Sequence, residues 1–433
     1  LEPPSVEETI RPHKEATTLA MQAVRCLAMT LLPLVLVLLS LPFSASFSVA
    51  MSPSRLLPRL GSSSRVVNGR AVGLRMQEDQ QQGLTRRNVG FLAAGVAAVV
   101  GSRKLVAGGV WEDGATNLKG KTAVVTGGNT GIGKETAVRL AGMGANVIIG
   151  CRSMKRGETA VAEIKERAAA GGGSVQCMEL DLSDLSSVRR FGEEFRRGHS
   201  ELYALVNNAG IMALPKRQES KDGFERQFAV NHLGHFELTK QLWPLLEKSE
   251  DARLVSVSSD AHFIAAGDAD PLSDWNSEKD YQPWGAYGRS KLFNILFAKE
   301  IARREGDKAK VSACAIHPGV VKTELGRSYF VPPEACNSIG SVECTGSLSP
   351  PEQLGLLALA PVMLYSAKTP AQGAMTQVKC AAAQGIGPSI NGKYLRDCAV
   401  GDTAPIANDA ELAGRLWALS EKLTGSPFKV GSA

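Results

Sequence analysis

The glycine-rich turn that starts at Thr126 constrains the fold of this chain more than any other stretch. It reads T-G-G-N-T-G-I-G and ends at Gly133. The β-branched run 122–126 before it is typical of a buried strand, and an amphipathic helix is predicted over about 132–143. A second apolar strand follows over 146–150. The stretch therefore predicts a β-α-β unit whose glycines lie between its first strand and its helix.

The spacing of three glycines in this turn, G-x-x-x-G-x-G, has a physical reason. Gly127 permits a sharp turn out of the strand, Gly131 lets the backbone approach a diphosphate, and Gly133 lets the helix pack closely. Free N–H groups and a partial positive charge at the helix N-terminus then face the phosphates. Because the pattern stands between a strand and a helix, it indicates a dinucleotide site rather than a structural turn.

The end of the second strand indicates which dinucleotide binds. NAD sites usually carry an acidic residue there for the ribose hydroxyls, whereas this chain has Cys151 and Arg152, followed by Lys155 and Arg156. A guanidinium pairs with a 2′-phosphate, which an acid would repel. We therefore expect NADP(H) as the cofactor. The alternative interpretation is that Arg152 is a solvated surface charge.

A tyrosine and a lysine lie four positions apart at Tyr287 and Lys291, within Y-G-R-S-K. Four positions is one helical turn, so both side chains project from one side of a helix. The pair alone does not separate a proton-transfer site from an exposed lysine beside a half-buried tyrosine. Its interpretation depends on the rest of the chain.

Composition narrows the domain organisation, the kinds of site and the partners that this chain can have. The chain has 433 residues, 44% hydrophobic and 21% charged, which is long enough for one large domain with appendages or for two domains. Its eight cysteines form no Cys-x-x-Cys, and no metal site is predicted from His232 and His235. The net charge of +6 is concentrated before the folded body, and no basic stripe with aromatics follows it. We therefore expect no nucleic-acid partner.

The first hundred residues are predicted to be targeting sequence. In 1–46, Met21 opens a segment with Arg25, an apolar run over 27–41 and small residues after it, which is typical of a signal peptide. A membrane-spanning helix is the alternative. Residues 47–87 are rich in Ser, Arg and Gln, and together with the signal they resemble the bipartite plastid presequences of algae with secondary plastids.

A second apolar segment is predicted over 88–107. It follows the pair Arg86-Arg87 and resembles a twin-arginine signal, although its run 89–100 is short for a membrane span. Cleavage, anchoring and membrane-surface association all stay open. We expect a plastid protein in the stroma or at the thylakoid membrane, because NADPH is expected in the stroma, with the thylakoid lumen as the alternative.

Ordered motifs across the body of the chain resemble the short-chain dehydrogenase/reductase family. They are T-G-G-N-T-G-I-G at 126–133, D-L at 181–182, V-N-N-A-G at 206–210, N-H-L-G-H-F at 231–236, V-S-S at 257–259, Y-G-R-S-K at 287–291 and H-P-G-V-V-K-T at 317–323. The subgroup resembled is that of retinol dehydrogenases, with similarity to plastid-envelope and protochlorophyllide-reductase-like enzymes. The resemblance spans about 118–425, and we place one domain over 115–433.

The resemblance implies a fold and a catalytic set. The expected fold is a Rossmann-like, doubly wound parallel α/β sheet of about seven strands with helices on both faces. Tyr287 would be the acid/base, with Lys291 favouring its phenolate and holding the nicotinamide ribose. Ser259 would bind the substrate oxygen, with Ser258 as the alternative serine, and Asn231 would complete a proton relay through water. The expected substrate contacts are Ser259 and Tyr287.

The resemblance also implies a cofactor set. Asp181 would lie near the adenine, and the turn after His317 would contact the nicotinamide carboxamide. Substrate-closing loops in the family vary where this chain has 326–353, and an apolar helix is predicted over 354–365. The complete set of expected cofactor contacts is Gly127, Asn129, Thr130, Gly131, Ile132, Gly133, Arg152, Asp181, Leu182, Asn208, Ala209, Gly210, Tyr287, Lys291, Pro318, Gly319, Val321 and Thr323.

The leading hypothesis is an NADP(H)-dependent oxidoreductase that interconverts a hydrophobic alcohol and its aldehyde or ketone, such as a retinoid, apocarotenoid or other isoprenoid. One alternative is a protochlorophyllide-reductase-like enzyme that reduces a C=C bond, although Ser259 favours carbonyl chemistry. Another is a non-catalytic NADP(H) redox sensor at a plastid membrane. The expected partner is a hydrophobic small molecule. Membrane association through 88–107 and a homodimer are further expectations.

Overall fold

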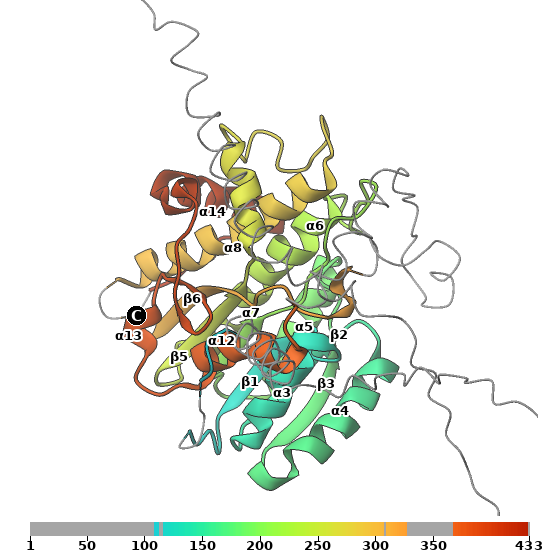
Figure 1. Ribbon diagram of the computed structural model, residues 1–433, viewed down its shortest axis with the longest axis vertical. Coiled ribbons are helices and arrows are strands. Elements are labelled where there is room, and N and C mark those ends of the chain that lie inside the picture. The colour runs from blue at the N-terminus through green and yellow to red at the C-terminus, as the bar shows by residue number, and fades with distance from the viewer. Residues whose placement is uncertain (1–107, 112–115, 307–308, 327–366, 432–433) are drawn as a thin grey trace, which may run out of the picture. The chain divides into compact units, whose positions relative to one another are not determined.

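The computed structural model describes residues 108–111, 116–306, 309–326 and 367–431 (Figure 1). Backbone contacts divide the chain into two units, Leu1–Gln81 and Gln82–Ala433, and all described residues belong to the second. The targeting segments predicted over 1–46, 47–87 and 88–107 lie outside the described residues, as do the helix predicted over 354–365 and all but the first residue of the substrate loop predicted over 326–353. Within the described ranges, no helix is both long and apolar enough to cross a bilayer.

A single sheet forms the centre of the domain, with strand order β3-β2-β1-β4-β5-β6-β7-β8. The first seven strands are parallel, as predicted, and the short β8 adds an antiparallel edge to β7. The strands are β1 Thr122–Thr126, β2 Asn146–Cys151, β3 Ser174–Glu179, β4 Ala204–Asn207, β5 Ala252–Val257, β6 Val311–His317, β7 Tyr394–Arg396 and β8 Ala399–Val400.

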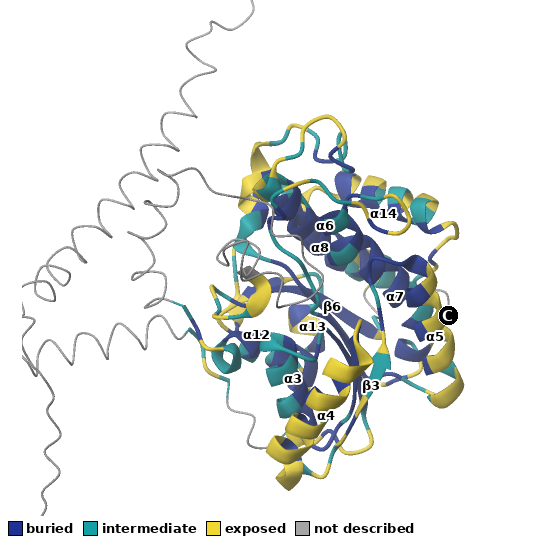
Figure 2. Ribbon diagram, turned by 90° about the vertical axis from the view of Figure 1, so that its right-hand side faces the viewer, coloured by how far each residue is buried: buried dark blue, intermediate teal, exposed yellow. Residues whose placement is uncertain are grey.

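Helices cover both faces of this sheet (Figure 2). The longer ones are α3 Gly131–Gly142, α4 Met154–Ala168, α5 Leu185–Gly198, α7 Gly234–Leu246, α8 Pro283–Glu305, α12 Pro370–Ala382 and α14 Ala410–Thr424. Shorter pieces are α6 Arg226–Phe228, a π-helical turn Ala229–Leu233, α13 Gly387–Ile390 and 3₁₀ turns Ala169–Gly171, Asp260–Gly267, Glu324–Gly326 and Pro405–Asn408.

The alternation of residues along each strand assigns the helices to the two faces. Val125 of β1 lies in one core with α3, α4 and α12, whereas its neighbour Val124 lies in another with α5, α7, α8 and α14. Both residues are fully buried, which explains why β1 reads as a continuous apolar run. The predicted Rossmann-like, doubly wound architecture is confirmed, and the predicted helix 132–143 is α3, displaced by one residue.

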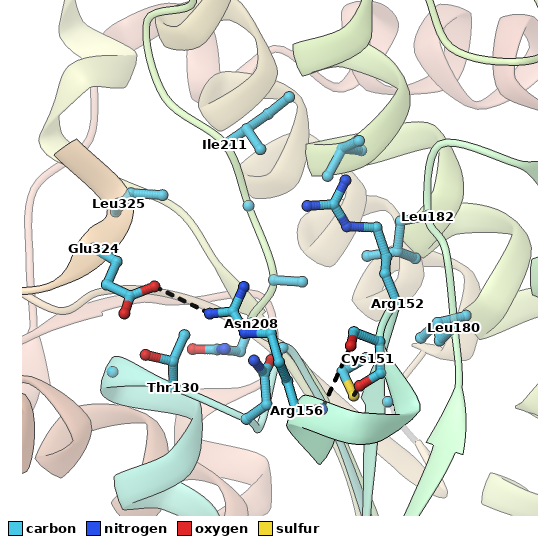
Figure 3. Close-up of a pocket in the computed structure, with 18 of the residues that line it drawn as sticks. Thr130, Cys151, Arg152, Arg156, Leu180, Leu182, Asn208, Ile211, Glu324 and Leu325 are labelled. Carbon is cyan, nitrogen blue, oxygen red and sulfur yellow. Dashed lines mark hydrogen bonds and ion pairs between the residues drawn. The ribbon is translucent and has the colours of Figure 1, made fainter. Parts of the chain in front are cut away.

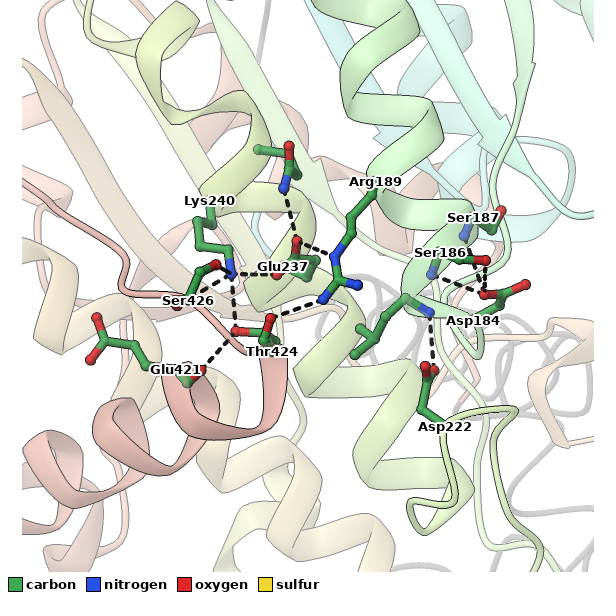
Figure 4. A network of polar contacts seen from close by, with 12 residues as sticks. Asp184, Ser186, Ser187, Arg189, Asp222, Glu237, Lys240, Glu421, Thr424 and Ser426 are labelled. Carbon is green, nitrogen blue, oxygen red and sulfur yellow. Dashed lines mark hydrogen bonds and ion pairs between the residues drawn. The ribbon is translucent and has the colours of Figure 1, made fainter.

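The C-terminal helix α14 is held by hydrogen bonds from ion-paired cations as well as by its apolar face. Buried Glu237 on α7 pairs with Arg189 of α5 and Lys240 of α7, at 3.2 and 2.6 Å (Figure 4). Both cations also reach Thr424 at the end of α14, Arg189 at its carbonyl oxygen and Lys240 at its hydroxyl. The charge buried in α7 therefore fixes the position of the C-terminal helix.

The first described residues lie against a turn formed late in the chain. Strands β7 and β8 are joined by Asp397 and Cys398, both with positive φ (50° and 61°), as a two-residue type I′ hairpin requires. The carbonyl of Gly109 accepts a hydrogen bond from the Cys398 thiol at 3.5 Å. A Cβ at Gly109 would stand 1.9 Å from the carbonyl oxygen of Asp397. The chain therefore enters the domain beside the hairpin.

Candidate active site

The four predicted catalytic residues meet at the carboxyl edge of the sheet. Tyr287 and Lys291 lie one turn apart on α8, Ser259 directly follows β5, and Asn231 lies in the π-helical turn before α7. The Ser259 hydroxyl is hydrogen-bonded to the Tyr287 phenol, and the Lys291 ammonium stands 5.6 Å from the centre of the tyrosine ring. Residues separated by up to 60 positions in sequence therefore share one site.

Burial acts on the tyrosine and the lysine in opposite directions. It raises the pKa of Tyr287 to about 12, against the lowering effect of the hydrogen bond from Ser259. It lowers the pKa of Lys291 to about 8. The Lys291 ammonium donates to the carbonyl of Val257 at 3.1 Å, which holds it beneath the end of β5. Both side chains are therefore largely shielded from water.

The two adjacent serines have different partners. The Ser258 hydroxyl is buried and donates to the carbonyl of Lys291 at 2.6 Å. The Ser259 side chain begins the 3₁₀ turn by accepting from the N–H of Ala261 at 3.1 Å, and it also contacts Tyr287. Ser259 is therefore the serine that faces the tyrosine, whereas Ser258 ties β5 to α8.

Asn231 is fixed by the loop after β4. Its side chain accepts from the N–H of Ile211 at 2.9 Å and donates to the carbonyl of Ile211 at 3.0 Å and to Ser290 at 2.9 Å. Ser290 in turn donates to the carbonyl of Tyr287. Asn231 therefore links the cofactor-side loop to the helix that carries the tyrosine.

His235 extends this link, and the sequence did not indicate it. Because the carbonyl of Asn231 only accepts, His235 Nδ1 donates to it at 3.1 Å, and Nε2 accepts from the Thr126 hydroxyl at 2.9 Å. That hydroxyl also accepts from the N–H groups of Asn208 and Ala209. Burial lowers the pKa of His235 to about 4, so the ring is neutral. Among the described residues, no His, Cys, Asp and Glu cluster suited to a metal is present.

A cavity of about 690 Å³ opens beside this edge. Helix α3 points its N-terminus into it, with no side-chain cap and no acidic residue in the first turn, so its N–H groups are free for an anion. Gly127 has a φ of +65°, which gives the turn its shape. The predicted residues that line the cavity are Gly127, Asn129, Thr130, Gly131, Ile132, Arg152, Asp181, Leu182, Asn208, Ala209, Gly210 and Thr323.

The other predicted cofactor residues stand behind or beside the lining. Gly133 lies under the turn, where a Cβ would come within 2.4 Å of the Asn208 side chain. Pro318, Gly319 and Val321 form the segment after β6 that pairs with Lys368, rather than lining the cavity. Tyr287 and Lys291 do not line the cavity either. Gly210 does line it, and a Cβ added at Gly210 would stand 3.4 Å from Lys291 Nζ.

Three arginines line the same cavity. Arg152 follows β2, Arg156 lies in α4 and Arg226 in α6. Arg156 pairs with Glu324 at 3.3 Å (Figure 3). Burial lowers the pKa of Arg226, and so does the nearby charge of Arg152. The nearby charge of Asp181 has the opposite effect, so two cations and one carboxylate lie at this end of the cavity, and their net positive charge would attract an anionic ligand.

Comparison with known proteins agrees with this geometry. The short chain dehydrogenase family model matches residues 121–269. Human retinol dehydrogenase 12 is 42% identical over 323 residues, which cover 75% of this chain and 92% of that protein. The chain belongs to the short-chain dehydrogenase family. It is therefore an oxidoreductase that acts on CH–OH groups, and its family binds NAD or NADP.

Two further matches support the relationship. Human retinol dehydrogenase 13 is 38% identical over 333 residues, covering 77% of this short-chain dehydrogenase and 92% of the relative. A crystal structure of an uncharacterised protein from Mycobacterium paratuberculosis is 32% identical and covers 74% of this chain and 99% of its own, with a TM-score of 0.53.

Sequence reasoning missed residues of this short-chain dehydrogenase that act through tertiary contacts. Asp260, next to Ser259, accepts from the Tyr394 hydroxyl at 2.8 Å and pairs with His317 and Arg396, so it fastens the serine loop to β6 and β7. Arg226 was also missed, because it lies 74 positions from Arg152 in sequence and no local motif connects them. The one signal for Asp260 in the sequence is its position directly after the V-S-S motif.

Proposed function

We propose that this protein is an NADP(H)-dependent enzyme that interconverts a hydrophobic alcohol and its aldehyde or ketone, with Tyr287 as the acid/base. The observation that carries the proposal is the buried contact between Tyr287, Ser259 and Lys291 at the edge of the dinucleotide cavity. A C=C reductase would not require a serine hydroxyl beside the tyrosine, so this contact favours carbonyl chemistry.

The chain's own residues account for the proton. In carbonyl reduction, the Tyr287 hydroxyl gives its proton to the substrate oxygen, and the phenolate that results stands near the Lys291 ammonium. Ser259 hydrogen-bonds the same substrate oxygen as charge develops on it. Asn231 hydrogen-bonds Ile211 in the loop after β4 and Ser290 on α8, and so fixes the position of that loop relative to α8. Alcohol oxidation uses the same steps in reverse.

The cavity residues fit a nicotinamide dinucleotide, which supplies or accepts the hydride when bound. The uncapped N-terminus of α3 and the turn 127–133 would hold the diphosphate. Arg152 would hold the 2′-phosphate, and the mutual repulsion between Arg152 and Arg226 supports a doubly charged group at that end. These residues are the basis for proposing NADP(H) over NAD(H).

Apolar side chains around the tyrosine support a hydrophobic substrate. Trp284 is 38% exposed and packs edge-on against Tyr287 with ring centres 6.0 Å apart. Phe263 and Ile264, on the 3₁₀ turn after Ser259, are 45% and 51% exposed. Ile264 lies against Gly288, the residue after Tyr287. Exposed apolar groups of this size beside a reactive hydroxyl are typical of a site for an apolar ligand.

Turnover with a substrate panel tests the proposal. NADPH consumption is measured with all-trans-retinal, apocarotenals and protochlorophyllide, the last in light and in darkness. We expect turnover of an aldehyde and a loss of about a hundred- to ten-thousand-fold in kcat in Tyr287→Phe. Tyr203→Phe is the matched control, because Tyr203 is 4% exposed, lies directly before β4 and does not line the cavity.

Two results would contradict the proposal. Light-dependent loss of protochlorophyllide without aldehyde turnover would instead indicate a C=C reductase. Tight NADPH binding with no turnover of any compound would indicate a redox sensor.

Cofactor choice has its own test. Removal of one charge-assisted contact is expected to raise the NADPH dissociation constant of Arg152→Gln about 10- to 100-fold, with little change for NADH. Arg197→Gln removes an exposed charge at the end of α5 and is expected to change neither constant. Equal weakening of both cofactors in Arg152→Gln would contradict a 2′-phosphate contact.

A further inference from the structure

Two cysteines face each other beside the dinucleotide cavity. Cys151 ends β2 and Cys177 lies in β3, and their sulfur atoms are 3.3 Å apart. In the parallel register Cys151 is opposite Glu179 and Cys177 is opposite Ile149. An offset of two residues puts both side chains on the same face of the sheet. The contact therefore joins the ends of two neighbouring strands.

The fold reserves space for this pair. Helix α4 crosses the two sulfurs at Gly157, where an added Cβ would stand 2.1 Å from Cys177 Sγ and 2.7 Å from Cys151 Sγ. Any other residue at this position would collide with the sulfurs. The Met154 sulfur lies 3.9 Å from Cys177 Sγ and leaves the group partly open to solvent.

Cys151 also lines the dinucleotide cavity, between Gly150 and Arg152. Its thiol donates to the carbonyl of Ser153 at 3.3 Å, and Ser153 starts α4 through its side chain. A movement of the Cys151 sulfur is therefore transmitted directly to Arg152 and Ser153, which line the same wall.

We propose that Cys151 and Cys177 form a redox-sensitive dithiol, which hydrogen peroxide oxidises to an intramolecular disulfide that weakens dinucleotide binding. The Cys151 thiolate attacks one peroxide oxygen, the O–O bond breaks, and the other oxygen leaves as hydroxide and takes up a proton. The Cys177 sulfur then attacks the sulfenic sulfur, the S–S bond forms, and a second water leaves. Two thiols thus lose two electrons and two protons, and one peroxide becomes two waters.

The environments of the two sulfurs support this order of events. The hydrogen bond from Cys177 lowers the pKa of Cys151, with a smaller contribution from the charge of Arg156, while the same contact raises the pKa of Cys177. Cys151 is therefore the more acidic of the two thiols, and the cavity gives the oxidant a route to it.

The disulfide would change the cavity wall. An S–S bond is about 2.0 Å long, so the sulfurs must move closer than their present 3.3 Å. That movement draws the end of β2 toward β3 and displaces Arg152. Conversely, a bound dinucleotide covers Cys151 and is expected to protect it from oxidation.

Peptide mapping of the full chain treated with peroxide tests the proposal, with NADPH binding measured by fluorescence. We expect a peptide that links Cys151 to Cys177 with the loss of two hydrogens, at least about threefold weaker NADPH binding, and reversal of both by dithiothreitol. Bound NADPH should slow the linkage. Because binding requires no turnover, the result is independent of the proposed carbonyl chemistry.

Matched variants complete the test. In Cys177→Ser no linked peptide should form, and peroxide should leave Cys151 as a sulfenic acid that dithiothreitol reverses. Cys314 and Cys380 are the internal control, because they contact each other but are fully buried, and they should stay reduced. The proposal would be overturned if the unsubstituted protein formed no Cys151–Cys177 peptide after peroxide treatment. It would also be overturned if the peptide formed and NADPH affinity stayed unchanged.

Discussion

Ser258 and Ser259 are neighbours in the chain, but their hydroxyl groups serve different parts of the molecule. Ser258 binds the backbone of α8 at Lys291, and Ser259 contacts the Tyr287 phenol. Strand alternation explains the difference, because successive side chains at the end of β5 point to opposite sides. The sequence alone left both serines as candidates.

Alanine substitutions separate the two serines. Ser259→Ala is expected to lower kcat about a hundred- to a thousandfold, because one donor to the developing oxyanion is lost, with little change in unfolding free energy. Ser258→Ala should instead lower the unfolding free energy by about 1–2 kcal/mol, through loss of a buried hydrogen bond. Aldehyde turnover and urea denaturation measure the two effects. The assignment is wrong if Ser258→Ala abolishes turnover in a fully folded protein.

Burial of the Lys291 charge lowers the stability of the folded protein. Its pKa in the folded protein is lowered from 10.5 to about 8, so the unfolded chain binds more protons between these pH values. Lys291→Met, which removes the buried charge, is therefore expected to raise the unfolding free energy at pH 7 by about 2 kcal/mol and to abolish turnover. The gain should shrink as pH rises from 8 toward 10.5. A gain that is independent of pH would contradict the assignment of a charged, buried Lys291.

At the scale of elements, α14 closes the core on one face of the sheet. Trp417 is 2% exposed and packs against Phe236 of α7, Phe297 of α8 and Phe428. The guanidinium of Arg304 lies 4.1 Å from the centre of its ring. Because these partners come from several helices, α14 contributes to the position of α8, which carries Tyr287.

Two substitutions on α14 should have opposite effects. Trp417→Ala is expected to lower the unfolding free energy by about 3–5 kcal/mol, because it leaves a large cavity. Gly414→Ala should raise it by about 0.5–1 kcal/mol, through helix propensity, since nothing lies within 4 Å of the added Cβ. Thermal unfolding measures both. Equal effects of the two substitutions would show that α14 does not pack as described.

Local signals in the sequence were enough for the first β-α-β unit, whereas the role of the Tyr287–Lys291 pair could be predicted only from the ordered motifs along the body of the chain. The run 122–126 is buried on both faces, and the turn 126–133 combines strand, glycines and helix within a few residues. The missed features depend on contacts between distant segments. His235, Asp260 and Arg226 acquire their roles only through Thr126, Tyr394 and Arg152, and β8 is two residues long.

At the scale of the whole molecule, a substitution at Gly109 tests whether its contact with the β7–β8 hairpin stabilises the folded domain. Gly109→Val is expected to lower the melting temperature, because its Cβ would stand 1.9 Å from a backbone oxygen. Gly142→Ala, at the exposed end of α3 with nothing within 4 Å, is the control and should be neutral or stabilising. An unchanged melting temperature in Gly109→Val would exclude this contact from the folded domain.

The contact between Gly109 and Cys398 joins residues 289 positions apart. On the ribosome, the chain before Gly109 is therefore made long before its partner exists. Contacts across such long sequence separations form slowly, because the chain between the two residues must be ordered first. Until Cys398 has been synthesised, the domain therefore lacks the contact that holds its first described residues against the β7–β8 hairpin.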